Sequence, residues 1–502
     1  MKNSRLEEIR SIKLAKVAKL REMGIDPYPA SAKKDFSNSY ILNNYSKFEG
    51  KEISLAGRLV GLREHGNIAF GHIQDETGKL QVFVQKKTLH ETSREKQNLG
   101  FTDFIKLTDV GDFLEVNGVV GKTVRGEISL IPSEIKILTK SVRPLPEKWH
   151  GIKDEELRYR QRYIDLLVND DLKDLFRKKA MFWQSIRNFM IDKGFLEVET
   201  PVLENTAGGA DANPFVTHHA AFDINLYLRI SMGELWQKRL MVAGFEKTFE
   251  IGRQFRNEGL SREHLQDYTQ MEFYWAYASY VDSMQLVEEM YKYVAQKVFG
   301  SLKFKINGFS INLDTKWEKI DYVDSIKAKM GIDVSVASID DLKNKLNELK
   351  IRFEKSDTQG RLIDLLWKQV RKEIGGPVFL VGHPVLVSPL SKRLEDRPEF
   401  TQRYQIILAG SEMGNGYSEL NDPVDQQERF KAQQGMRDEG DKEAQMHDYD
   451  FVQALEFGMP PVTGFGVSER LFSFLADLPV REAVLFPLLK PESIKKVKKQ
   501  EK

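Results

Sequence analysis

Charged and apolar side chains alternate along residues 248–277, which read TFEIGRQFRNEGLSREHLQDYTQMEFYWAY. The alternation predicts two antiparallel strands joined by a polar loop. The charged face carries Arg256 and Glu258 on the first strand and Glu272 and Tyr274 on the second. A guanidinium, two carboxylates and a phenol that converge over a sheet suit a ligand with both negative and positive charge. The alternative is an amphipathic hairpin whose charged face forms salt bridges in solvent.

Two segments near the C-terminus also contain residue types that bind charged ligands. In the run GNGYSEL, Asn415, Tyr417 and Glu419 share one face of an extended chain, and the two glycines of the run leave room above it. The alternative for Glu419 is an exposed residue after a glycine loop. In the run GFGVSER, Arg470 is predicted in the first turn of a helix whose N-cap is Ser468. An arginine at a helix N-terminus favours the binding of polyphosphate.

The composition limits the class of protein. A chain of 502 residues is too long for one hydrophobic core, which predicts two or three domains. Lys and Arg total 75 against 74 for Asp and Glu, so any nucleic-acid-binding surface must be local. The absence of cysteine excludes disulfides and thiolate zinc sites. The sequence has no apolar run of membrane-spanning length and no signal-peptide core, so we expect a soluble cytoplasmic protein without a membrane partner.

Residues 1–48 are predicted to form a basic helix followed by a linker. An apolar stripe that includes Leu6, Ile12 or Lys13, and Leu20 runs through residues 1–23, with lysines and arginines between its members. We expect this helix to pack on its own domain, and the alternative is an arm that contacts phosphates. The prolines of GIDPYP, at residues 24–29, predict an extended linker.

Residues 49–142 contain short alternating runs separated by glycine-rich turns, such as ISLAGRLVGLR and GKLQVFVQ. Strands this short and closely spaced predict a small β-barrel of the OB-fold type. A tight turn at residues 75–78 is expected to place Ile73 opposite Leu80 or Val82. Such barrels bind single-stranded nucleic acid by stacking bases on exposed aromatic side chains and reading base edges with polar ones.

A linker at residues 143–146 leads to a second domain, predicted over residues 149–502. A helix is expected over residues 172–193, with Phe176, Trp183, Ile186 and Met190 on one face, and then a strand at FLEVET. The amphipathic helices of residues 281–375 predict an inserted helical subdomain.

Two local patterns in the second domain have simple interpretations. Adjacent strand residues point to opposite faces, so His218 and His219 do not predict a metal site. Asp422 followed by Pro423 predicts the N-cap and the first residue of a helix.

The run FRNEG, followed after a polar loop by Met271-Glu272, resembles the second signature of class II aminoacyl-tRNA synthetases, and the surrounding sequence is similar to the lysyl-tRNA synthetases. The similarity covers nearly the whole chain: the helix and strand before Pro201 resemble the first signature, and GFGVSER resembles the third. The resemblance implies an α+β protein with an N-terminal OB-fold β-barrel and a catalytic domain built on an antiparallel sheet flanked by helices. It also implies a homodimeric ligase that converts L-lysine and ATP to lysyl-adenylate and pyrophosphate and transfers lysine to the 3′ end of tRNA(Lys).

The resemblance assigns roles to individual residues. The catalytic residues are Arg256, at the ATP α-phosphate, and Arg470, at the γ-phosphate. The lysine-binding residues are Gly209, Glu234, Glu272, Tyr274, Asn415, Tyr417 and Glu419. The ATP-binding residues are Arg256, Glu258, His264, Tyr268, Glu412 and Arg470, and the Mg²⁺ ligands are Glu412 and Glu419. The residues implied to read a U-rich anticodon are Arg63, Phe70, Gln81, Phe83 and Glu127, although the pattern alone favours barrel core for at least one phenylalanine.

The chemistry of the implied amino-acid pocket favours lysine. A cationic side chain that enters a pocket must meet a fixed anion, because an unpaired buried ammonium is prohibitively costly. Glu419 and Tyr274 would supply a carboxylate and a phenol oxygen for the ε-ammonium. Aspartate would require a cation at this place, which argues against a sister enzyme for aspartate or asparagine.

Four departures from the family pattern leave a further alternative open. Glu263 stands where the family has arginine, with Arg262 displaced by one residue, and Gln405 takes the place of an acidic Mg²⁺ ligand. The glycine segment before Arg470 is one residue shorter than usual, and the junction before Glu234 is one residue longer. A tRNA-binding or regulatory paralogue with a weakened active site is therefore conceivable. The barrel at residues 52–138 argues against a paralogue that lysylates proteins.

Overall fold

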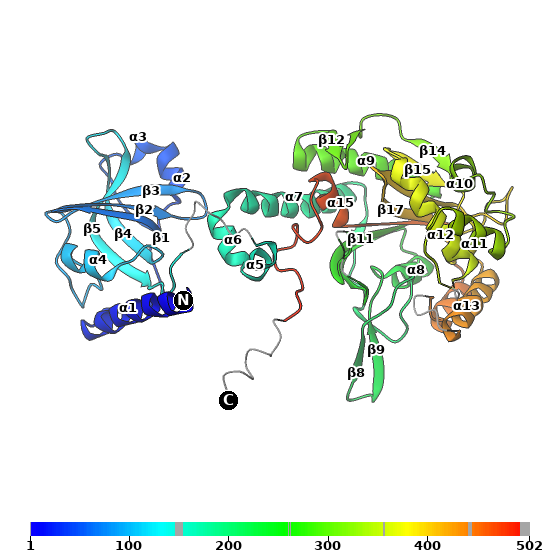
Figure 1. Cartoon of the computed structure of the whole chain (residues 1–502), viewed down its shortest axis with the longest axis horizontal. Helices are drawn as coiled ribbons and strands as arrows, with labels where there is room; N and C mark the ends of the chain where they lie inside the picture. The colour runs from blue at the N-terminus through cyan, green and yellow to red at the C-terminus, as the bar shows by residue number, and fades with distance from the viewer. Residues whose placement is uncertain are drawn as a thin grey trace. The chain divides into compact units, whose positions relative to one another are not determined.

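The computed structural model of the chain describes residues 2–145, 154–259, 261, 263–354, 357–439 and 444–491 (Figure 1). The chain divides into two compact units, Met1–Val168 and Asn169–Lys502, and each has a hydrophobic core of its own. Residues 146–153, which contain the end of the predicted linker and the predicted domain start at residue 149, lie outside the described residues, as does Arg262.

The predicted basic helix, α1 (Lys2–Glu22), opens the first unit. Lys13 and Leu20 are buried whereas Ile12 is 55% exposed, so the packed face contains Lys13 and not Ile12. Lys16 Nζ lies 2.8 Å from Asp109 Oδ1, next to the last strands of the unit. The helix therefore packs on the body of its own unit, as expected.

The predicted barrel is formed by β1 (Glu52–His65), β2 (Ile68–Gln74), β3 (Lys79–Gln85), β4 (Phe113–Lys122) and β5 (Ile128–Thr139). It closes in the order β1-β2-β3-β5-β4. The Asp75 carboxylate stabilises the tight turn by accepting hydrogen bonds from the backbone N–H groups of Thr77 and Gly78, at 2.8 and 3.1 Å. Ile73 pairs with Leu80, one of the two predicted registers. The other helices of the unit are α2 (Asn38–Asn43), α3 (Tyr45–Phe48), α4 (Phe101–Leu107), α5 (Glu155–Arg160) and α6 (Arg162–Val168).

An eight-stranded, mainly antiparallel sheet organises the second unit. In spatial order its strands are β14 (Glu318–Asp321), β15 (Val378–Val381), β16 (Arg403–Leu408), β17 (Ser411–Ser418), β18 (Val462–Ser468), β11 (Asp267–Ala276), β10 (Lys247–Phe255) and β6 (Leu196–Glu197). The hairpin predicted at residues 248–277 is confirmed, because β10 and β11 pair antiparallel with Thr248 opposite Tyr274. The prediction that Arg256 and Glu258 lie on its first strand is wrong, since β10 ends at Phe255 and both residues follow it. The predicted FLEVET strand is reduced to the two residues of β6, which pair in parallel with β10 at the sheet edge.

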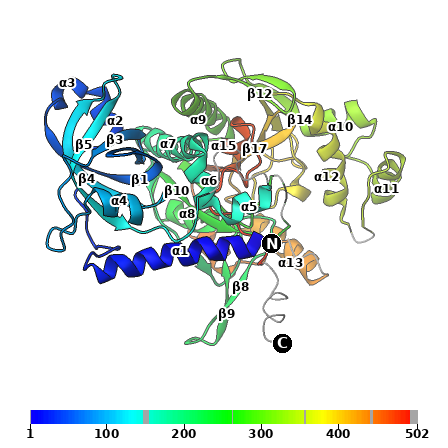
Figure 2. The same ribbon diagram turned by 60° about the vertical axis from the view of Figure 1, so that its left-hand side comes forward.

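Two long helices, α7 (Asp170–Asp192) and α9 (Tyr280–Phe299), cover one face of this sheet (Figure 2). Phe182 of α7 packs in one cluster with Phe249 and Phe273 of the sheet, and all three are fully buried. Burial of aromatic area of this kind is the main contribution to the stability of the unit.

The buried face of α7 differs from the predicted one. Ile186 and Met190 are buried as expected, but Phe176 and Trp183 are only partly buried. Phe189 takes a central position on the buried face. The helix is therefore rotated relative to the expectation, and Trp183 lies at the margin of the apolar stripe, where a large ring keeps partial exposure.

A second hydrophobic cluster lies within the stretch predicted as a helical insertion. It joins α10 (Tyr322–Met330), α11 (Ile339–Glu348) and α12 (Gln359–Val370) around the buried Trp367. The helix at the start of that stretch, α9, packs in the main core.

The second unit contains further helices and short strands. They are α8 (Glu234–Val242), α13 (Pro423–Asp438), α14 (Tyr449–Glu456), α15 (Arg470–Leu475), η1 (Arg371–Glu373), η2 (Val385–Val387), β7 (Leu203–Glu204), β8 (Val216–His219), β9 (Ile224–Leu228), β12 (Lys303–Ile306) and β13 (Phe309–Asn312). The predicted cap of α13 is confirmed, because the Asp422 carboxylate accepts the N–H groups of Val424 and Asp425. The β8–β9 hairpin extends away from the rest of the unit (Figures 1 and 2).

Candidate active site

A cavity of about 450 Å³ lies on the sheet face opposite α7 and α9. It is lined by every residue predicted to bind lysine or ATP, namely Gly209, Glu234, Arg256, Glu258, His264, Tyr268, Glu272, Tyr274, Glu412, Asn415, Tyr417, Glu419 and Arg470. The alternation along β11 explains part of this set, since Phe273 packs in the core while Glu272 and Tyr274 face the cavity. The fold thus brings together residues from distant parts of the sequence.

Glu419, which is 1% exposed, forms one end of the cavity. It directly follows β17, and Tyr274 lies on β11, so the two residues come from strands on either side of β18. A Cβ at Gly464 of β18 would lie 2.3 Å from Glu419 Oε1 and 2.7 Å from Tyr274 Cε1. The absence of a side chain at Gly464 therefore leaves the space in which the carboxylate and the phenol ring approach each other.

Lys238, which was not predicted, connects two of the predicted carboxylates. Its Nζ lies 2.6 Å from Glu234 Oε1 and 2.5 Å from Glu419 Oε2, and the residue is 1% exposed. Burial acts to lower the pKa of Lys238, but the two carboxylates outweigh burial and hold this pKa above its ordinary value. The helical i,i+4 spacing of Glu234 and Lys238 was the signal in the sequence that could have revealed the first of these pairs.

The charges at this end of the cavity do not cancel. Glu234, Glu272 and Glu419 are buried carboxylates, and Lys238 is the cation that lies between two of them. Burial raises the pKa of Glu419 well above its ordinary value although Lys238 opposes this shift, and the ammonium group of a bound ligand would favour the ionised carboxylate. With all four groups ionised, the set carries two negative charges. Because isolated buried charge is unfavourable, such a site favours a ligand that supplies two positive charges.

Glu234 and Gly209, which the resemblance assigns to the α-amino group of lysine, lie close together. Gly209 has φ of +85°, and a Cβ there would lie 2.9 Å from Glu234 Cβ and 2.4 Å from Ser231 Oγ. Tyr417 Oη donates a hydrogen bond of 2.5 Å to Glu234 Oε1. The longer junction before α8 is accommodated by Gly233, whose φ of +65° lets Glu234 begin the helix inside the cavity.

Arg256 is the available cation in the other half of the cavity. It is half-buried, its Nε donates to the carbonyl of Ile230 at 3.4 Å, and its guanidinium lies 5.9 Å from the Tyr268 ring. Among the described residues it forms no ion pair. Tyr268, predicted in the loop, lies in β11, where its hydroxyl accepts a hydrogen bond from Gln254 Nε2 at 2.6 Å. An unpaired guanidinium beside an aromatic ring suits a nucleotide phosphate next to its base.

Arg470 lies at the far end of the cavity and pairs with the Glu263 carboxylate. The residue before its helix is Glu469, which already has helical dihedral angles, whereas the predicted N-cap, Ser468, is the last residue of β18. Ser468 still contributes, since its Oγ accepts the Arg470 N–H at 3.3 Å. The third signature therefore places Arg470 in the cavity despite its shortened glycine segment.

Glu412 is held by groups from three elements. Its Oε1 accepts a hydrogen bond from Trp367 Nε1 at 2.9 Å and lies 3.4 Å from an Arg371 nitrogen, and its Oε2 accepts from Gln405 Nε2 at 3.2 Å. A hard cation such as Mg²⁺ prefers carboxylate oxygens and retains water readily. Glu412 fits that chemistry as a single carboxylate, whereas Gln405 supplies a neutral amide and Glu419 is occupied by Lys238.

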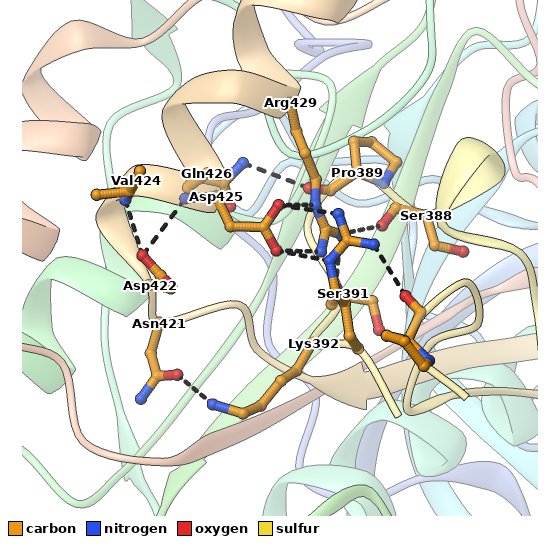
Figure 3. A network of polar contacts seen from close by, with 12 residues as sticks. Ser388, Pro389, Ser391, Lys392, Asn421, Asp422, Val424, Asp425, Gln426 and Arg429 are labelled. Carbon is orange, nitrogen blue, oxygen red and sulfur yellow. Dashed lines mark hydrogen bonds and ion pairs between the residues drawn. The ribbon is translucent and has the colours of Figure 1, made fainter. Parts of the chain in front are cut away.

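The wall formed by Ser388, Pro389 and Ser391 is held in place by Arg429 (Figure 3). The Arg429 guanidinium donates to the carbonyls of Ser388 at 3.1 Å and Ser391 at 2.8 Å. It also pairs with Asp425, which lies one turn earlier on α13. The cap and the network of α13 thus fix a loop of the pocket.

The residues predicted to read an anticodon gather on one face of the barrel. Phe70 and Phe83 pair across β2 and β3 with ring centroids 4.9 Å apart, and both are half-buried. Neither belongs to the buried core, so the core interpretation favoured for at least one of them is wrong. Gln81 Nε2 donates to Glu127 Oε2 at 2.7 Å, and Arg63 pairs with Phe70 in the register of β1 and β2. A stacked aromatic pair with a polar group beside it suits unstacked bases.

Known proteins resemble the chain over nearly its whole length. The family model for class II tRNA synthetases (D, K and N) matches residues 154–490, and that for the OB-fold nucleic acid binding domain matches residues 53–138. The lysine–tRNA ligase of Thermotoga sp. (strain RQ2) is 43% identical over 495 residues, or 97% of each chain. The chain belongs to the lysine–tRNA ligase family. The lysine–tRNA ligases of Thermoanaerobacter pseudethanolicus, over 97% of each chain, and Carboxydothermus hydrogenoformans, over 98% of this chain and 100% of that one, are also 43% identical.

Membership of the lysine–tRNA ligase family confirms the predicted fold class, an N-terminal OB-fold followed by a class II catalytic domain. Within the described parts of the chain, no helix is long and apolar enough to cross a membrane. No group of three His, Cys, Asp or Glu side chains in those parts could hold a metal ion.

Two cavity residues were missed in the sequence for different reasons. Lys238 has the helical i,i+4 spacing from Glu234, which the sequence contains. Arg403 donates from Nε to Asn415 Oδ1 at 2.8 Å and lines the cavity, but it lies on β16 and acts across a strand pair. Without the register of β16 and β17, nothing in the sequence distinguishes Arg403 from a surface arginine.

The Glu272 carboxylate predicts how lysine binding depends on pH. It accepts hydrogen bonds from Met232 N at 2.9 Å, Gln270 Nε2 at 2.6 Å and Tyr274 Oη at 3.0 Å, while burial raises its pKa to about 7. Ionised carboxylates attract the ammonium groups of lysine, so the KM for lysine should fall as the pH rises through about 7. Exchange assays over this range test the prediction, and Glu272→Gln should lack the step.

The same pKa has an effect of opposite sign on the stability of the ligand-free protein. A carboxyl group whose folded pKa lies above its unfolded value of 4.5 stabilises the folded state below that value, and this contribution is lost as the pH rises to about 7. Thermal unfolding at several pH values should therefore show a stability loss in wild type that is smaller in Glu272→Gln. An equal loss in both proteins would contradict the assignment to Glu272.

Replacement of Phe70 or Phe83 by alanine should weaken tRNA binding about tenfold or more, since a stacked base contributes about 1–3 kcal/mol. Lysine-dependent ATP–pyrophosphate exchange should be unchanged, because the substitution leaves the catalytic unit intact. Tyr40→Ala, which removes an aromatic ring that is 46% exposed on α2, is the matched control. Equal loss of tRNA affinity in Tyr40→Ala would contradict a specific role for the Phe70–Phe83 pair.

Proposed function

We propose that this chain activates L-lysine with ATP and transfers lysine from lysyl-adenylate to the 3′ end of tRNA(Lys). Its family membership, at 43% identity over 495 residues, supports this reaction. The observation that carries the choice of substrate is the charge of the cavity. Three buried carboxylates and one buried ammonium leave two negative charges, which match the two ammonium groups of lysine.

In this proposal the ends of the cavity bind different groups of lysine. Glu419 and Tyr274, which both line the cavity, receive the ε-ammonium. Glu234 and the backbone at Gly209 receive the α-ammonium, and Glu272 supplies further negative charge. Asn415 and Tyr417 line the wall between the ends. The carboxylate of lysine is then directed towards Arg256, whose guanidinium lacks an internal anion among the described residues.

Catalysis in this arrangement depends on positioning and on neutralisation of charge. The lysine carboxylate attacks the α-phosphorus of ATP in line, the bond to the bridging oxygen breaks, and pyrophosphate leaves. Arg256 stabilises the charge that develops at the α-phosphate, and Arg470 holds the far phosphate. Tyr268 and Glu258 bind the adenine, with His264 near the phosphates. The ribose hydroxyl of the tRNA then attacks the acyl carbon of lysyl-adenylate, the bond between that carbon and the phosphate oxygen breaks, and AMP leaves. No covalent enzyme intermediate forms.

We also propose that Mg²⁺ accompanies ATP, with Glu412 as its ligand from the protein. Glu419, the other residue that the resemblance implies as a ligand, pairs with Lys238 and in this proposal receives the ε-ammonium instead. When bound, the ion would neutralise charge on the phosphates. Of the positions that the resemblance assigns to Mg²⁺, Glu419 pairs with Lys238 and Gln405 is a neutral amide, so Glu412 is left as the ligand. An ion held mainly by phosphate oxygens and water fits this arrangement.

The first unit is proposed to bind the anticodon of tRNA(Lys) through Arg63, Phe70, Gln81, Phe83 and Glu127. The net charge of +1 requires this interaction to depend on local groups. A homodimer and a cytoplasmic location are proposed on the basis of family membership.

A second candidate function, a tRNA-binding or regulatory paralogue with a weak active site, rests on the Glu263–Arg470 pair at the ATP end of the cavity. ATP–pyrophosphate exchange measured with each of the twenty amino acids separates the candidates. The ligase predicts exchange with lysine alone. Exchange with aspartate or asparagine would support a sister enzyme, and no exchange with any amino acid would support the paralogue.

A further inference from the structure

Glu263 forms an ion pair with Arg470, the arginine at the end of the cavity where the phosphates of ATP are proposed to bind. Its carboxylate pairs with the Arg470 guanidinium and accepts a hydrogen bond from Ser411 Oγ at 3.4 Å. Both partners are partly shielded, with side chains that are 35% and 21% exposed for Glu263 and Arg470. The Glu263 N–H donates to Ser261 Oγ at 3.1 Å, and Glu263 lines the cavity. An anion of the protein therefore lies where ATP is proposed to place its terminal phosphate.

The pair leaves Arg470 incompletely satisfied. Arg470 Nε is buried and has no hydrogen-bond partner among the described residues. A terminal phosphate carries three acceptor oxygens and more negative charge than a carboxylate, so it can engage more of the guanidinium donors. Two anions on one guanidinium repel each other. We therefore expect phosphate and the Glu263 carboxylate to exclude each other at Arg470.

A second cavity provides space for the displaced carboxylate. This cavity of about 80 Å³ is lined by Glu263 and Arg470 together with Ser473, Asp477 and others. The pair thus lies at the boundary between the two cavities. Rotation of the Glu263 side chain can vacate the larger cavity without a change in the strands that carry the other ligands.

We propose that Glu263 is an internal competitor of the ATP triphosphate at Arg470. In the free enzyme it keeps the guanidinium neutralised, and ATP binds by displacing it. The same competition weakens the rebinding of pyrophosphate, which favours product release. The inference rests on the proposed role of Arg470 in ATP binding, and it concerns a residue that departs from the family pattern.

The direction in which ATP affinity changes in Glu263→Gln distinguishes a competitor role for Glu263 from a purely structural role. If Glu263 competes with ATP, its neutralisation in Glu263→Gln strengthens ATP binding, because binding no longer requires an ion pair to be broken. If Glu263 only holds Arg470 in position, the same substitution weakens ATP binding. Because solvent screens the partly exposed Glu263–Arg470 ion pair, breaking it costs little free energy. We therefore expect Glu263→Gln to bind ATP about five- to tenfold more tightly.

The test measures two constants. They are the KM for ATP in lysine-dependent exchange and the inhibition constant of pyrophosphate as a product inhibitor of lysyl-adenylate formation. In Glu263→Gln both should fall about five- to tenfold, with the KM for lysine unchanged. Asp267→Asn is the matched control, since it removes a carboxylate that pairs with Arg253 and lines neither cavity. An unchanged or increased KM for ATP in Glu263→Gln, or an equal fall in Asp267→Asn, would overturn the competitor role.

A third variant separates failure of this inference from failure of the proposed function. Arg470→Ala should weaken ATP binding. If Arg470→Ala weakens it and Glu263→Gln does not strengthen it, only the competitor role is wrong. If Arg470→Ala leaves ATP binding unchanged, the proposed role of Arg470 is wrong and the competitor role fails with it.

Discussion

Replacement of Glu419 by glutamine is expected to lower kcat/KM for lysine in ATP–pyrophosphate exchange by about 100-fold or more. The substitution leaves the ε-ammonium without its anion, and a buried charge that loses its partner costs about 2–5 kcal/mol. It also removes one of the two carboxylates that lie beside Lys238 Nζ. The KM for ATP should change little, because Glu419 lies at the opposite end of the cavity from the proposed phosphate site.

The matched control for this variant is Glu204→Gln, which changes another buried acid of the same unit. Burial raises the pKa of Glu204 to about 8, so it is mostly protonated at neutral pH and glutamine is a close substitute. Glu204→Gln should retain lysine-dependent exchange. If the two variants lose activity equally, the effect of Glu419→Gln reflects general damage to the fold and the role of Glu419 is not supported.

Replacement of Arg256 by alanine should reduce kcat for lysyl-adenylate formation by about 10²- to 10³-fold. Its guanidinium is proposed to stabilise charge that develops at the α-phosphate in the transition state, and loss of one such donor has effects of this size. Single-turnover formation of the adenylate measures the step directly. The expected pattern is a larger change in kcat than in the KM for lysine.

Arg253→Ala provides the control for Arg256→Ala. Arg253 lies on β10, three residues before Arg256, is 46% exposed and pairs with Asp267 at 2.7 Å outside the cavity lining. Loss of this exposed pair should have little effect on adenylate formation. An Arg256→Ala variant with a rate near that of Arg253→Ala would contradict the assignment of Arg256 to the α-phosphate.

The part of the site that the sequence predicted depends on local periodicity. The alternation of residues 267–276 placed Glu272 and Tyr274 on one face of a strand, and Asp422-Pro423 marked a helix start. Both features follow from the geometry of a single element. The barrel strands were predictable for the same reason, together with their turn at residues 75–78.

The part that the sequence could not predict depends on contacts between distant elements. Glu263 and Arg470 are separated by 207 positions, and no local pattern pairs them. Lys238 is the intermediate case, because its contact with Glu234 has helical spacing whereas its contact with Glu419 requires the tertiary fold. The resemblance to lysyl-tRNA synthetases named the binding residues but gave no indication that a lysine of the protein lies between two of them.

The barrel shows a related limit. Phe70 and Phe83 have the spacing of core residues, yet the two rings stack on each other outside the buried core. Alternation identifies which residues share a face of a strand. It does not tell which face of a small barrel is the interior when both faces contain apolar side chains.

A comparison of two ligands and two proteins tests whether Glu419 binds the ε-ammonium of lysine. Calorimetry would measure the affinities of wild type and Glu419→Gln for lysine and for 6-hydroxynorleucine, which carries a hydroxyl in place of the ε-ammonium. Wild type should prefer lysine by about 100-fold or more, and the preference should nearly vanish in Glu419→Gln. If Glu419→Gln loses affinity for both ligands equally and keeps the preference, Glu419 does not bind the ε-ammonium, and the account is contradicted.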